Sequence, residues 1–402
     1  MRILFLTPYP AYPANSGGTQ RMFQLIRELS SQHELWCLSL SPSHKASAAA
    51  QPLNQYCNLT LIPAPQRSLA KRAWTTLASP LPDMALRAPL PMFRSALASL
   101  LNTNRFDLVQ AESIEMAQYA LQAQRWGVPA TLDQWNAEYL LQQRAAQTDR
   151  QQPKRWHAAL YSAIQWRKLA RYERLVCNQL DQTYVVSPED RTMLQKIGVT
   201  KQLYVVPNGV DSQQFSPSQT RQFDPNTLLF TGSLDFRPNV DALRWFVQEV
   251  LPLIRAERPA TKLLIVGRAP TAAVLQLAQP GVIDIMPNVP SVQPYFNQAA
   301  VFVLPMRMGG GVRLKLLEAL ATETPLVSTT MGADGVTGLV PNQHCLLADT
   351  PPAFAQATLK LLHDRQLAQR LATAARSFVA ANYDWQAITG RLQQAWGEIS
   401  HG

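Results

Sequence analysis

A chain of 402 residues is longer than one hydrophobic core usually supports, so we expect two domains of roughly 200 residues each. Hydrophobic residues make up 47% and charged residues 16% of the sequence, which excludes an intrinsically disordered chain. The net charge of +10 arises mostly in residues 1–205, which hold 22 Lys and Arg against 13 Asp and Glu; residues 206–402 hold 15 against 14. A basic first half predicts either an anionic partner, such as nucleic acid, phospholipid head groups or a phosphorylated acceptor, or a charge that serves solubility alone.

Targeting and cysteine signals are weak. No segment of about 18 apolar residues occurs, so no membrane-spanning helix is predicted. The apolar run before Pro8 is too short for a signal-peptide core and is interpreted as a first strand. The four cysteines are scattered without a C-x-x-C pair, which argues against a disulfide framework and a zinc site. We therefore expect a cytoplasmic protein.

Short apolar segments alternate with helical patterns along the chain. In the first half, strands are predicted at residues 3–7, 34–40, 58–64, 107–112, 130–134 and 182–187. In the second half, they are predicted at residues 228–233, 262–267, 282–286, 300–305 and 325–330. Continuous apolar strands between helices indicate parallel sheets covered on both faces. The sequence thus predicts an α/β protein with two doubly wound parallel sheets in succession.

Two polar segments interrupt this alternation. Residues 205–227 are rich in Pro, Asn, Gly, Ser and Asp and are interpreted as a connection between domains, so the first domain is expected at 1–206 and the second at 207–384. Residues 142–159 are rich in Gln and are predicted to form an exposed loop that joins two helices.

The segment MRMGGGVRLKLLEALA, residues 306–321, places a glycine loop between a strand and a helix. Glycines let the backbone approach a ligand closely, and the free N–H groups of a helix start attract anions. Arg313 and Lys315 in the first turn are unfavourable beside the helix dipole unless an anion binds, so a phosphate or diphosphate is predicted. Glu318 could accept hydrogen bonds from vicinal sugar hydroxyls; the alternative is a surface pair of Lys315 with Glu318.

A second glycine loop, Ser16-Gly17-Gly18, follows the first strand and precedes an amphipathic helix. It is typical of a phosphate or sugar loop, although a tight turn alone would also explain it. It is not G-x-G-x-x-G, and no acidic residue follows at the ribose-reading distance, which disfavours a nicotinamide-dependent oxidoreductase.

The order and spacing of several motifs carry a family resemblance. VVSPEDRTML (185–194), VPNGVDSQQF (206–215), LIVGRAP (264–270), GVIDIMPNVPSVQPYFNQAAVFVLP (281–305) and GGGVRLKLLEALATETPLVST (309–329) stand in this order. With the two glycine loops they resemble a GT-B fold glycosyltransferase of family 4, in its glycine-rich GGGxRxKxLE branch. The resemblance implies two Rossmann-like domains that face each other across a cleft, with the first completed by a helix at 385–402. It also implies a retaining enzyme that uses a nucleotide sugar.

The resemblance implies roles for particular positions. Arg313 and Lys315 would neutralise the donor diphosphate, and Glu318 would hold the ribose hydroxyls; these three form the predicted catalytic set. Asn208, Gly209 and Asp211 would shape the turn between the domains. The predicted donor-binding residues are Gly17, Gly18, Arg237, Gly267, Arg268, Asn288, Val289, Gly309, Gly310, Gly311 and Val312.

The acceptor side is expected in the first domain, at Glu112, Trp135, Asn136 and Glu138. Relatives often have a histidine where this chain has Trp135, so a histidine base is not expected here. A retaining front-face mechanism lets the departing diphosphate take the acceptor proton, whereas inversion needs a general base. Trp135 is predicted to stack on a sugar face or lipid, with core packing as the alternative.

Two further departures concern the donor side. Many relatives have a second glutamate that is separated from the Glu318 equivalent by seven residues, where this chain has Gly310, and an arginine near the position of Ser233. No D-x-D sequence occurs, so we expect no metal and no cofactor, with charge neutralisation left to Arg313, Lys315 and the helix dipole. The donor is expected to be linked to UDP or GDP.

Residues 154–174 carry six basic residues and one acidic residue, interleaved with Trp156, Tyr161, Ile164 and Trp166. This pattern predicts either a helix on an anionic membrane or a helix with one buried face. Peripheral contact with the inner face of the membrane is therefore part of the prediction.

The leading hypothesis is a metal-independent, retaining glycosyltransferase acting on a carbohydrate or lipid-linked acceptor in polysaccharide, glycolipid or glycoconjugate synthesis. The alternative is a nucleotide-sugar-binding protein without catalysis, which Gly310 leaves open. Nucleic-acid binding is disfavoured because acidic residues are interspersed and no aromatic platform is present.

Overall fold

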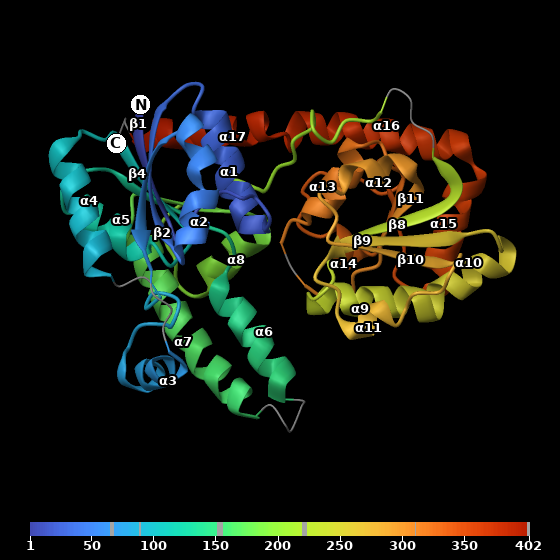
Figure 1. Cartoon of the computed structure of the whole chain (residues 1–402), viewed down its shortest axis with the longest axis horizontal. Helices are drawn as coiled ribbons and strands as arrows, with labels where there is room; N and C mark the ends of the chain where they lie inside the picture. Colours follow the sequence, from blue (N-terminus) through green and yellow to red (C-terminus); the bar gives the residue numbers. More distant parts are fainter. Residues whose placement is uncertain (65–67, 88–89, 151–155, 219–222, 310, 400–402) are drawn as a thin grey trace. The chain divides into compact units, whose positions relative to one another are not determined.

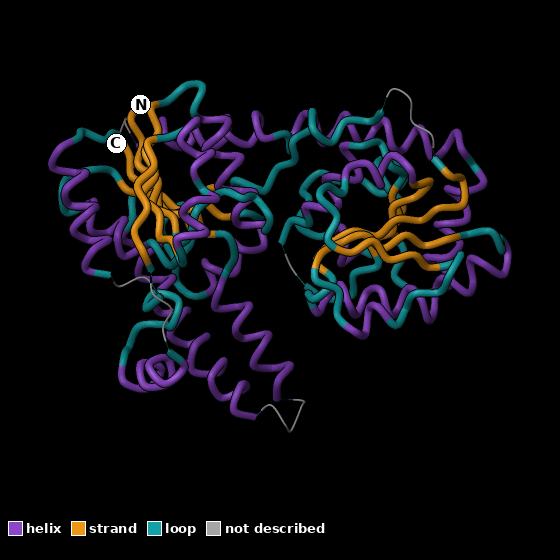
Figure 2. Tube along the Cα trace, viewed as in Figure 1, coloured by secondary structure: helices purple, strands orange, loops and turns teal. Residues whose placement is uncertain are grey.

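The computed structural model of the protein describes residues 1–64, 68–87, 90–150, 156–218, 223–309 and 311–399. By its internal contacts the chain divides into two compact units. Unit 1 comprises Met1–Pro207 together with Thr389–Gly402, and unit 2 comprises Asn208–Ile388. Each unit contains one parallel sheet with helices on both faces (Figure 1, Figure 2). The predicted α/β class with two Rossmann-like sheets is confirmed.

Unit 1 is built around a seven-stranded sheet with the order β3-β2-β1-β4-β5-β6-β7. Its strands are β1 (Arg2–Thr7), β2 (Glu34–Ser41), β3 (Asn58–Pro63), β4 (Leu108–Glu112), β5 (Ala130–Gln134), β6 (Gln182–Val185) and β7 (Leu203–Val205). Six of them were predicted, and the three-residue β7 was not. Every residue of β4 and β5 is buried, as expected for central strands covered on both faces.

The helices of unit 1 connect and cover these strands. They are α1 (Gly17–Leu29), α2 (His44–Ala49), η1 (Gln51–Gln55), α3 (Leu69–Ala78), α4 (Pro91–Thr103), α5 (Ala117–Gln124), α6 (Glu138–Arg150), α7 (Trp156–Gln179) and α8 (Pro188–Lys196). Helix α17 (Trp385–Ile399) begins in unit 2 and belongs to unit 1 from Thr389 onward. The end of α17 packs on unit 1, where Gln182 Nε2 donates to the Ala395 carbonyl at 2.7 Å. Within the described ranges, no helix combines the length and apolarity needed to cross a membrane.

The predicted loop at 142–159 is wrong over most of its length. Residues 142–150 belong to α6 and residues 156–159 to α7, while residues 151–155 lie outside the described part. The segment before Pro153 holds Gln, Ala and Arg, which have good helix propensity, and it lacks Gly and Pro. Its polar composition therefore reflects an exposed helix instead of a loop.

Unit 2 contains a six-stranded sheet with the order β10-β9-β8-β11-β12-β13. Its strands are β8 (Asp224–Ser233), β9 (Lys262–Arg268), β10 (Ile283–Pro287), β11 (Ala299–Leu304), β12 (Leu326–Ser328) and β13 (Leu346–Leu347). Its helices are α9 (Arg237–Trp245), η3 (Phe246–Val250), α10 (Leu251–Glu257), α11 (Ala272–Leu275), α12 (Gln293–Gln298), α13 (Leu314–Ala321), α14 (Thr330–Ala333), α15 (Pro351–His363) and α16 (Arg365–Asn382). The predicted connection 205–227 is wrong at its end, because the polar residues 224–227 already pair with neighbouring strands.

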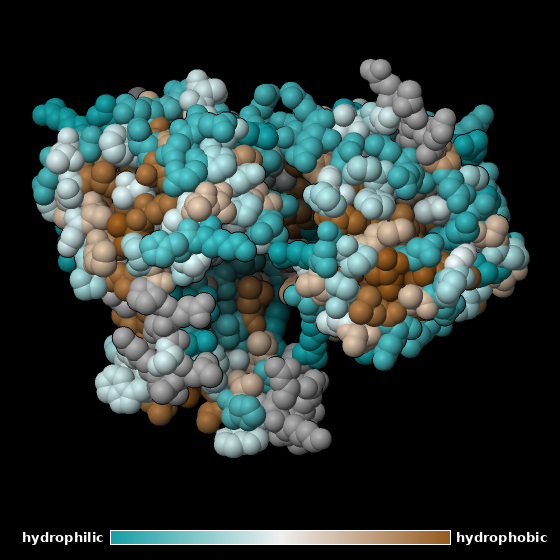
Figure 3. All heavy atoms as spheres, viewed as in Figure 1, coloured by the Kyte–Doolittle hydropathy of each residue, from teal (hydrophilic) through white to brown (hydrophobic). Residues whose placement is uncertain are grey.

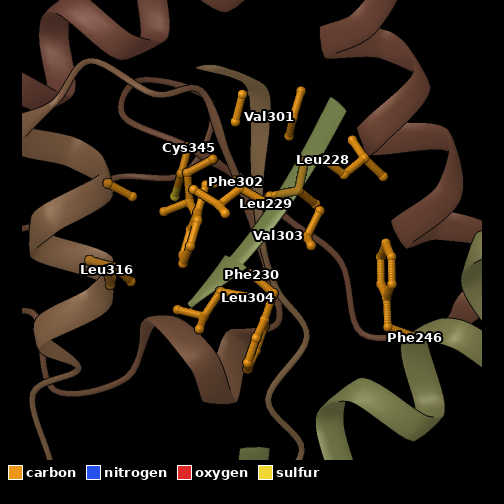
Figure 4. Packing of buried hydrophobic residues seen from close by; sticks show 14 of the residues in the cluster. Leu228, Leu229, Phe230, Phe246, Val301, Phe302, Val303, Leu304, Leu316 and Cys345 are labelled. Carbon is orange, nitrogen blue, oxygen red and sulfur yellow. The ribbon is translucent and has the colours of Figure 1, made fainter. Parts of the chain in front are cut away.

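The core of unit 2 fixes the orientation of α13. Leu228–Phe230 of β8 and Val301–Leu304 of β11 are almost completely buried, and Leu316 packs toward them (Figure 4). Leu317 and Leu320 are buried with Leu316, so they form the apolar face of α13. The first turn and the side opposite this face are left for polar side chains.

The segment that follows Val206 is held by the end of α16 and the start of α17. Val210 N donates to the Tyr383 carbonyl at 2.8 Å, and Ser212 Oγ donates to Asp384. A Cβ on Gly209 would lie 2.9 Å from the Tyr383 carbonyl oxygen, so this close approach requires glycine.

A buried ion pair ties three parts of unit 1 together. The Arg21 guanidinium of α1 binds both carboxylate oxygens of Asp133, at 2.6 and 2.8 Å. It also donates to the carbonyls of Val206 and Pro207, at 2.9 and 3.0 Å. Both side chains of the pair are at most 2% exposed, so removing one partner would leave a charge buried without compensation.

We predict that Asp133→Ala destabilises unit 1 by about 3–5 kcal/mol. The loss should appear in urea titrations followed by hydrogen exchange of amides in β5 and α1. The matched control is Glu34→Gln, which breaks the exposed pair of Arg2 with Glu34 and should leave these amides nearly unchanged. Equal protection of β5 in Asp133→Ala and in the parent protein would contradict the prediction.

Candidate active site

In doubly wound sheets, ligands bind outside the carboxyl ends of the strands at the point where the strand order reverses. In unit 2 this point lies between β8 and β11, since β9 and β10 continue on one side and β12 and β13 on the other. The parallel register places Gly232 beside Gly267, and Gly267 beside Pro287. The ends of β8, β9 and β10 therefore lie side by side at this edge of the sheet.

Arg313 folds back onto this loop. A Cβ on Gly309 would lie 2.8 Å from both terminal nitrogens of the Arg313 guanidinium, and Gly309 has φ +116. Glycine at 309 thus provides the space for the arginine. The Arg313 Nε atom is buried without a hydrogen-bond partner among the described residues, and burial lowers the pKa of this guanidinium.

The start of α13 lacks an acidic residue in its first turn. Arg313 is the N-cap residue, and no described side chain caps the helix. Asp334 acts on Arg313 and Glu318 acts on Lys315 only over a distance, without a salt bridge. The positive end of the helix dipole and two cationic side chains therefore lie together. An anion at this position would relieve the repulsion and supply the missing acceptor for Arg313 Nε.

Lys315 is anchored on β8 and α9. Its Nζ donates to Asn239 Oδ1 at 2.8 Å and lies 4.3 Å from the centre of the Phe230 ring. A Cβ on Gly232 would lie 2.5 Å from Nζ, so this glycine makes room for the lysine. Burial and the nearby Arg313 lower the pKa of Lys315 to about 7.

Glu318 lies about one turn further along α13, near Lys315 but without a salt bridge to it. Burial raises the pKa of Glu318 to about 7, against the opposing effect of Lys315. No described residue donates a hydrogen bond to its carboxylate. The alternative of a simple Lys315 and Glu318 surface pair does not describe this geometry, because Nζ is engaged by Asn239.

The residues predicted to flank the nucleotide base join the ends of β9 and β10. Asn288 N donates to the Gly267 carbonyl at 2.8 Å, and Asn288 Oδ1 accepts from Ala269 N at 2.9 Å. Arg268 Nε donates to Ser233 Oγ at 2.9 Å, so this exposed guanidinium lies over the end of β8. Val289 follows as a half-buried side chain packed against the core.

The remaining donor-side predictions are placed as follows. Arg237 is exposed at the start of α9, and Gly310 lies outside the described residues. Gly311 and Val312 pack beneath Gly335, whose Cβ would lie 3.0 Å from the Gly311 carbonyl. Gly335 therefore holds the second half of the glycine loop close to the loop after α14.

Unit 1 has its own point of strand reversal, between β1 and β4. Ser16 caps α1 there through a capping box with Thr19. A Cβ on Gly18 would lie 2.7 Å from Trp135 and 2.7 Å from the Tyr9 hydroxyl, whereas a Cβ on Gly17 would meet no atom within 4 Å. The tight turn alone explains neither the close contact at Gly18 nor the half-buried Trp135 ring, which lies 6.1 Å from Tyr9.

Glu112 positions Trp135. The carboxyl group is fully buried, accepts from Gln110 Nε2 at 2.8 Å and accepts from Trp135 Nε1 at 3.3 Å. Burial and the neighbouring Asp133 raise the pKa of Glu112 well above its usual range. Because Glu112 has no exposed surface in this structure, its place on the acceptor side stays a prediction, and its effect there would be exerted through Trp135.

Asn136 and Glu138 lie beside Trp135 at the start of α6. Asn136 Nδ2 donates to Glu138 Oε1 at 3.1 Å, and both side chains are half-buried. Burial raises the pKa of Glu138 to about 7. Trp135, Asn136 and Glu138 thus form a partly exposed polar and aromatic edge that suits a sugar ring.

Sequence reasoning missed Asn239, Gly232 and Tyr9. Asn239 is 4% exposed and holds Lys315, and Tyr9 packs against the Gly18 turn. The only signal for Asn239 was its position in the first turn of the helix after β8. Lys315 and Asn239 are 76 positions apart in the sequence, so local spacing does not reveal their contact.

Both units of the chain match known protein families. A family model described as Glycosyltransferase Family 4 matches residues 15–214, and one described as Glycosyl transferases group 1 matches residues 225–364. An uncharacterized 44.6 kDa protein in the cps region of Klebsiella pneumoniae is 28% identical over 39% of this chain and 42% of its own length. A GDP-mannose-dependent alpha-(1-6)-phosphatidylinositol monomannoside mannosyltransferase of Mycobacterium tuberculosis is 27% identical over 52% of this chain and 60% of its own length. These matches extend over about half the length of the curated relatives.

Solved structures are similar over nearly the whole chain. Sucrose-phosphate synthase from Thermosynechococcus elongatus superposes with a TM-score of 0.74 at 16% identity and covers 100% of both chains. Anabaena HepE in complex with UDP superposes with a TM-score of 0.68 at 11% identity, over 99% of this chain and 100% of that one. At these identities the likeness concerns the fold.

We predict that Gly18→Ala displaces the Trp135 ring, because the new methyl group would overlap Trp135 and Tyr9. Overpacking of this kind costs about 1–3 kcal/mol. Near-ultraviolet circular dichroism and the melting temperature should both change. Gly17→Ala is the matched control and should leave both signals as they are; identical spectra for the two variants would refute the packing argument.

Proposed function

The chain belongs to the glycosyltransferases of the GT-B fold, and we propose that it transfers a sugar from a nucleotide-sugar donor to a hydroxyl group of a carbohydrate or lipid-linked acceptor. The observation that carries the proposal is the unpartnered Arg313 Nε at the uncapped start of α13, with Lys315 and Glu318 beside it. The proposed setting is polysaccharide, glycolipid or glycoconjugate synthesis at the cytoplasmic side of a membrane.

In the proposed donor site, Arg313, Lys315 and the first N–H groups of α13 bind the diphosphate. Glu318 accepts hydrogen bonds from the ribose hydroxyls, one turn away. The Gly267–Asn288 hydrogen bond holds the ends of β9 and β10 together where the base would bind. The structure of HepE holds UDP, and the mycobacterial relative is named for GDP-mannose, which supports a UDP- or GDP-linked donor.

Retention is proposed for the transfer step. The bond between the anomeric carbon and the diphosphate oxygen breaks, the acceptor oxygen attacks from the same face, and a departing phosphate oxygen takes the acceptor proton. Arg313 and Lys315 stabilise the negative charge that develops on the leaving diphosphate. No metal is part of the proposal, because the sequence lacks D-x-D and these cations can supply the positive charge.

Inversion is the second candidate, and Glu138 favours it. A carboxyl group with a pKa of about 7 at the edge of unit 1 is suited to act as a general base. The anomeric configuration of the product, read from its proton NMR coupling, decides between the two mechanisms.

The function is tested by melting-temperature shifts with UDP, GDP, ADP and TDP and their sugars, because a ligand that binds only the folded state raises the melting temperature. Release of nucleoside diphosphate from the best donor is then followed with and without EDTA. We expect one base class to stabilise the protein and release to continue in EDTA. Binding without release would favour a non-catalytic nucleotide-sugar-binding protein, and no binding of any donor would refute the proposal.

Arg313→Ala should weaken binding of the preferred nucleoside diphosphate by about 1.5–3 kcal/mol, because a charge-assisted hydrogen bond is lost. Isothermal titration calorimetry measures the change. The control is Arg307→Ala in the same loop, whose guanidinium is already paired with Asp241 at 2.7 Å. Glu318→Ala should lower affinity for the nucleoside part in a protein that remains folded. Parent affinity in both Arg313→Ala and Glu318→Ala would overturn the site assignment.

Lys315 should couple donor binding to protonation. With a pKa of about 7 it is mostly neutral at pH 8, and a bound diphosphate favours the ammonium form. Glu318, also with a pKa of about 7, is already ionised at pH 8. When the diphosphate binds at pH 8, the protein should therefore take up about one proton per site.

Calorimetry in buffers of different ionisation enthalpy measures this uptake. Lys315→Met should abolish it, while Lys262→Met, on an exposed lysine at the opposite end of β9, should retain it. Proton release by the parent protein at pH 8, or unchanged uptake in Lys315→Met, would contradict the role given to Lys315.

A further inference from the structure

Unit 1 exposes large apolar side chains at the end where α3 and the start of α7 lie. Trp74 is 70% exposed, Leu77 80%, Trp156 68% and Leu160 55%. Figure 1 shows α3 and the first turns of α7 extending beyond the sheet of unit 1, and Figure 3 shows brown, hydrophobic atoms at this end. Apolar side chains gathered in this way mark an interaction surface more often than a plain solvent face.

Helix α3 has its polar side turned inward. Arg72 binds Asp83 and the Tyr161 hydroxyl, and Thr76 accepts from Gln165 Nε2 at 3.2 Å. Lys168 of α7 donates to the carbonyls at the end of α3. This polar network attaches α3 to α7 through one face of the helix.

The opposite face of α3 carries Trp74 and Leu77. With 3.6 residues per turn, these side chains point about 100–160° away from Arg72 and Thr76. Trp74 and Leu77 are therefore turned to solvent, while Thr76 is buried and Arg72 is partly buried against α7.

Helix α7 contributes a second outward stripe. Trp156, Leu160, Arg167 and Arg171 fall within about 60° of one another around the helix. Both arginines are exposed, and Glu173, which supplies the single carboxylate of α7, is buried on the other side, where it accepts from the backbone N–H groups of Glu138 and Tyr139. The stripe is thus apolar at its start, basic further along and without an exposed acid.

We propose that this surface docks unit 1 on an anionic lipid bilayer. The α3–α7 surface is defined by Trp74, Leu77, Trp156, Leu160, Arg167 and Arg171. The two tryptophans and two leucines enter the head-group region, where amphipathic aromatic rings are favoured, and the arginines bind lipid phosphates. The prediction from sequence concerned residues 154–174 alone and missed the contribution of α3.

The charge of the surface selects the bilayer over a protein partner. An anionic bilayer has negatively charged head groups above an apolar hydrocarbon layer. Basic side chains next to apolar side chains, without exposed acids, are complementary to both of these layers. Residues 1–205 also carry nine more basic than acidic residues, 22 against 13, which adds a longer-range attraction. A second copy of this chain would bring the same positive charges together.

Sedimentation with vesicles tests the proposal. The full chain should bind vesicles that contain phosphatidylglycerol and phosphatidylcholine in 0.1 M salt, and should bind pure phosphatidylcholine vesicles far more weakly. Arg167→Gln with Arg171→Gln should lower partition onto the anionic vesicles by on the order of 30-fold. Trp74→Ser with Leu77→Ser should lower it further at high salt, where the charge is screened.

Two controls separate insertion from folding. Trp126→Ser removes another exposed tryptophan of unit 1, 43% exposed, and should bind as the parent protein does. Trp74→Tyr keeps an interfacial aromatic ring and should retain most of the binding. All variants are compared by circular dichroism and by melting temperature before use.

The proposal is overturned if the parent protein ignores anionic vesicles, if the Trp74 and Leu77 variant binds them like the parent, or if the surface instead forms a dimer that this variant dissociates in ultracentrifugation. Vesicle binding requires no sugar donor, so its failure would leave the proposed transferase activity untouched. A membrane position would bring the enzyme to a lipid-linked acceptor, a consequence that rests on the proposed function.

Discussion

The electrostatic conflict at the start of α13 is the feature on which the account of this protein depends. A helix start is already positive, and here it is uncapped and carries Arg313 and Lys315. Neither cation forms a salt bridge with a described carboxylate: Arg313 lies against Gly309, and Lys315 contacts Asn239 and the Phe230 ring. Repulsion among these positive charges destabilises the unliganded protein, and binding of an anion relieves it.

The fold provides this arrangement through packing in unit 2. The apolar side of α13 is fixed by Leu316, Leu317 and Leu320 against β8 and β11, so the first turn must lie at the carboxyl ends of these strands. Gly232 and Gly309 supply the space that the two long cations need. Stability of the core and placement of the charges are thus two results of one packing pattern.

The edge of unit 1 follows a similar logic with different chemistry. The buried Glu112 holds the Trp135 indole, and Gly18 allows the ring to lie close to α1. The aromatic face, Asn136 and Glu138 remain accessible beside it. In the proposed function, the charges of unit 2 would bind the donor, and the aromatic and hydrogen-bonding edge of unit 1 would bind the acceptor.

The sequence predicted the central strands well because their signal is local. Residues 3–6 and 300–305 are continuously apolar, and the strands predicted at 3–7 and 300–305 lie within one residue of the observed limits. β7 and β13 were missed because two or three residues carry no periodicity. The prediction of a loop at 142–159 is wrong because polar, Gln-rich segments also form exposed helices, and these residues have good helix propensity.

Contacts between distant residues could not be predicted in the same way. The glycine loop, Arg313 and Lys315 were visible as a motif. Their partners come from other elements, Gly232 from β8 and Asn239 from α9. The attachment of α3 to α7 likewise depends on Tyr161, Gln165 and Lys168, which lie some 90 residues further along the chain. Such contacts follow from the fold and not from local spacing.

A crystal structure of the protein with its preferred nucleoside diphosphate tests the central claim most directly. We predict diphosphate oxygens within hydrogen-bonding distance of Arg313 and Lys315, about 2.7–3.2 Å, and a ribose hydroxyl that donates to the Glu318 carboxylate. A diphosphate bound elsewhere, with Arg313 still folded on Gly309 and Lys315 still on Asn239, would contradict it.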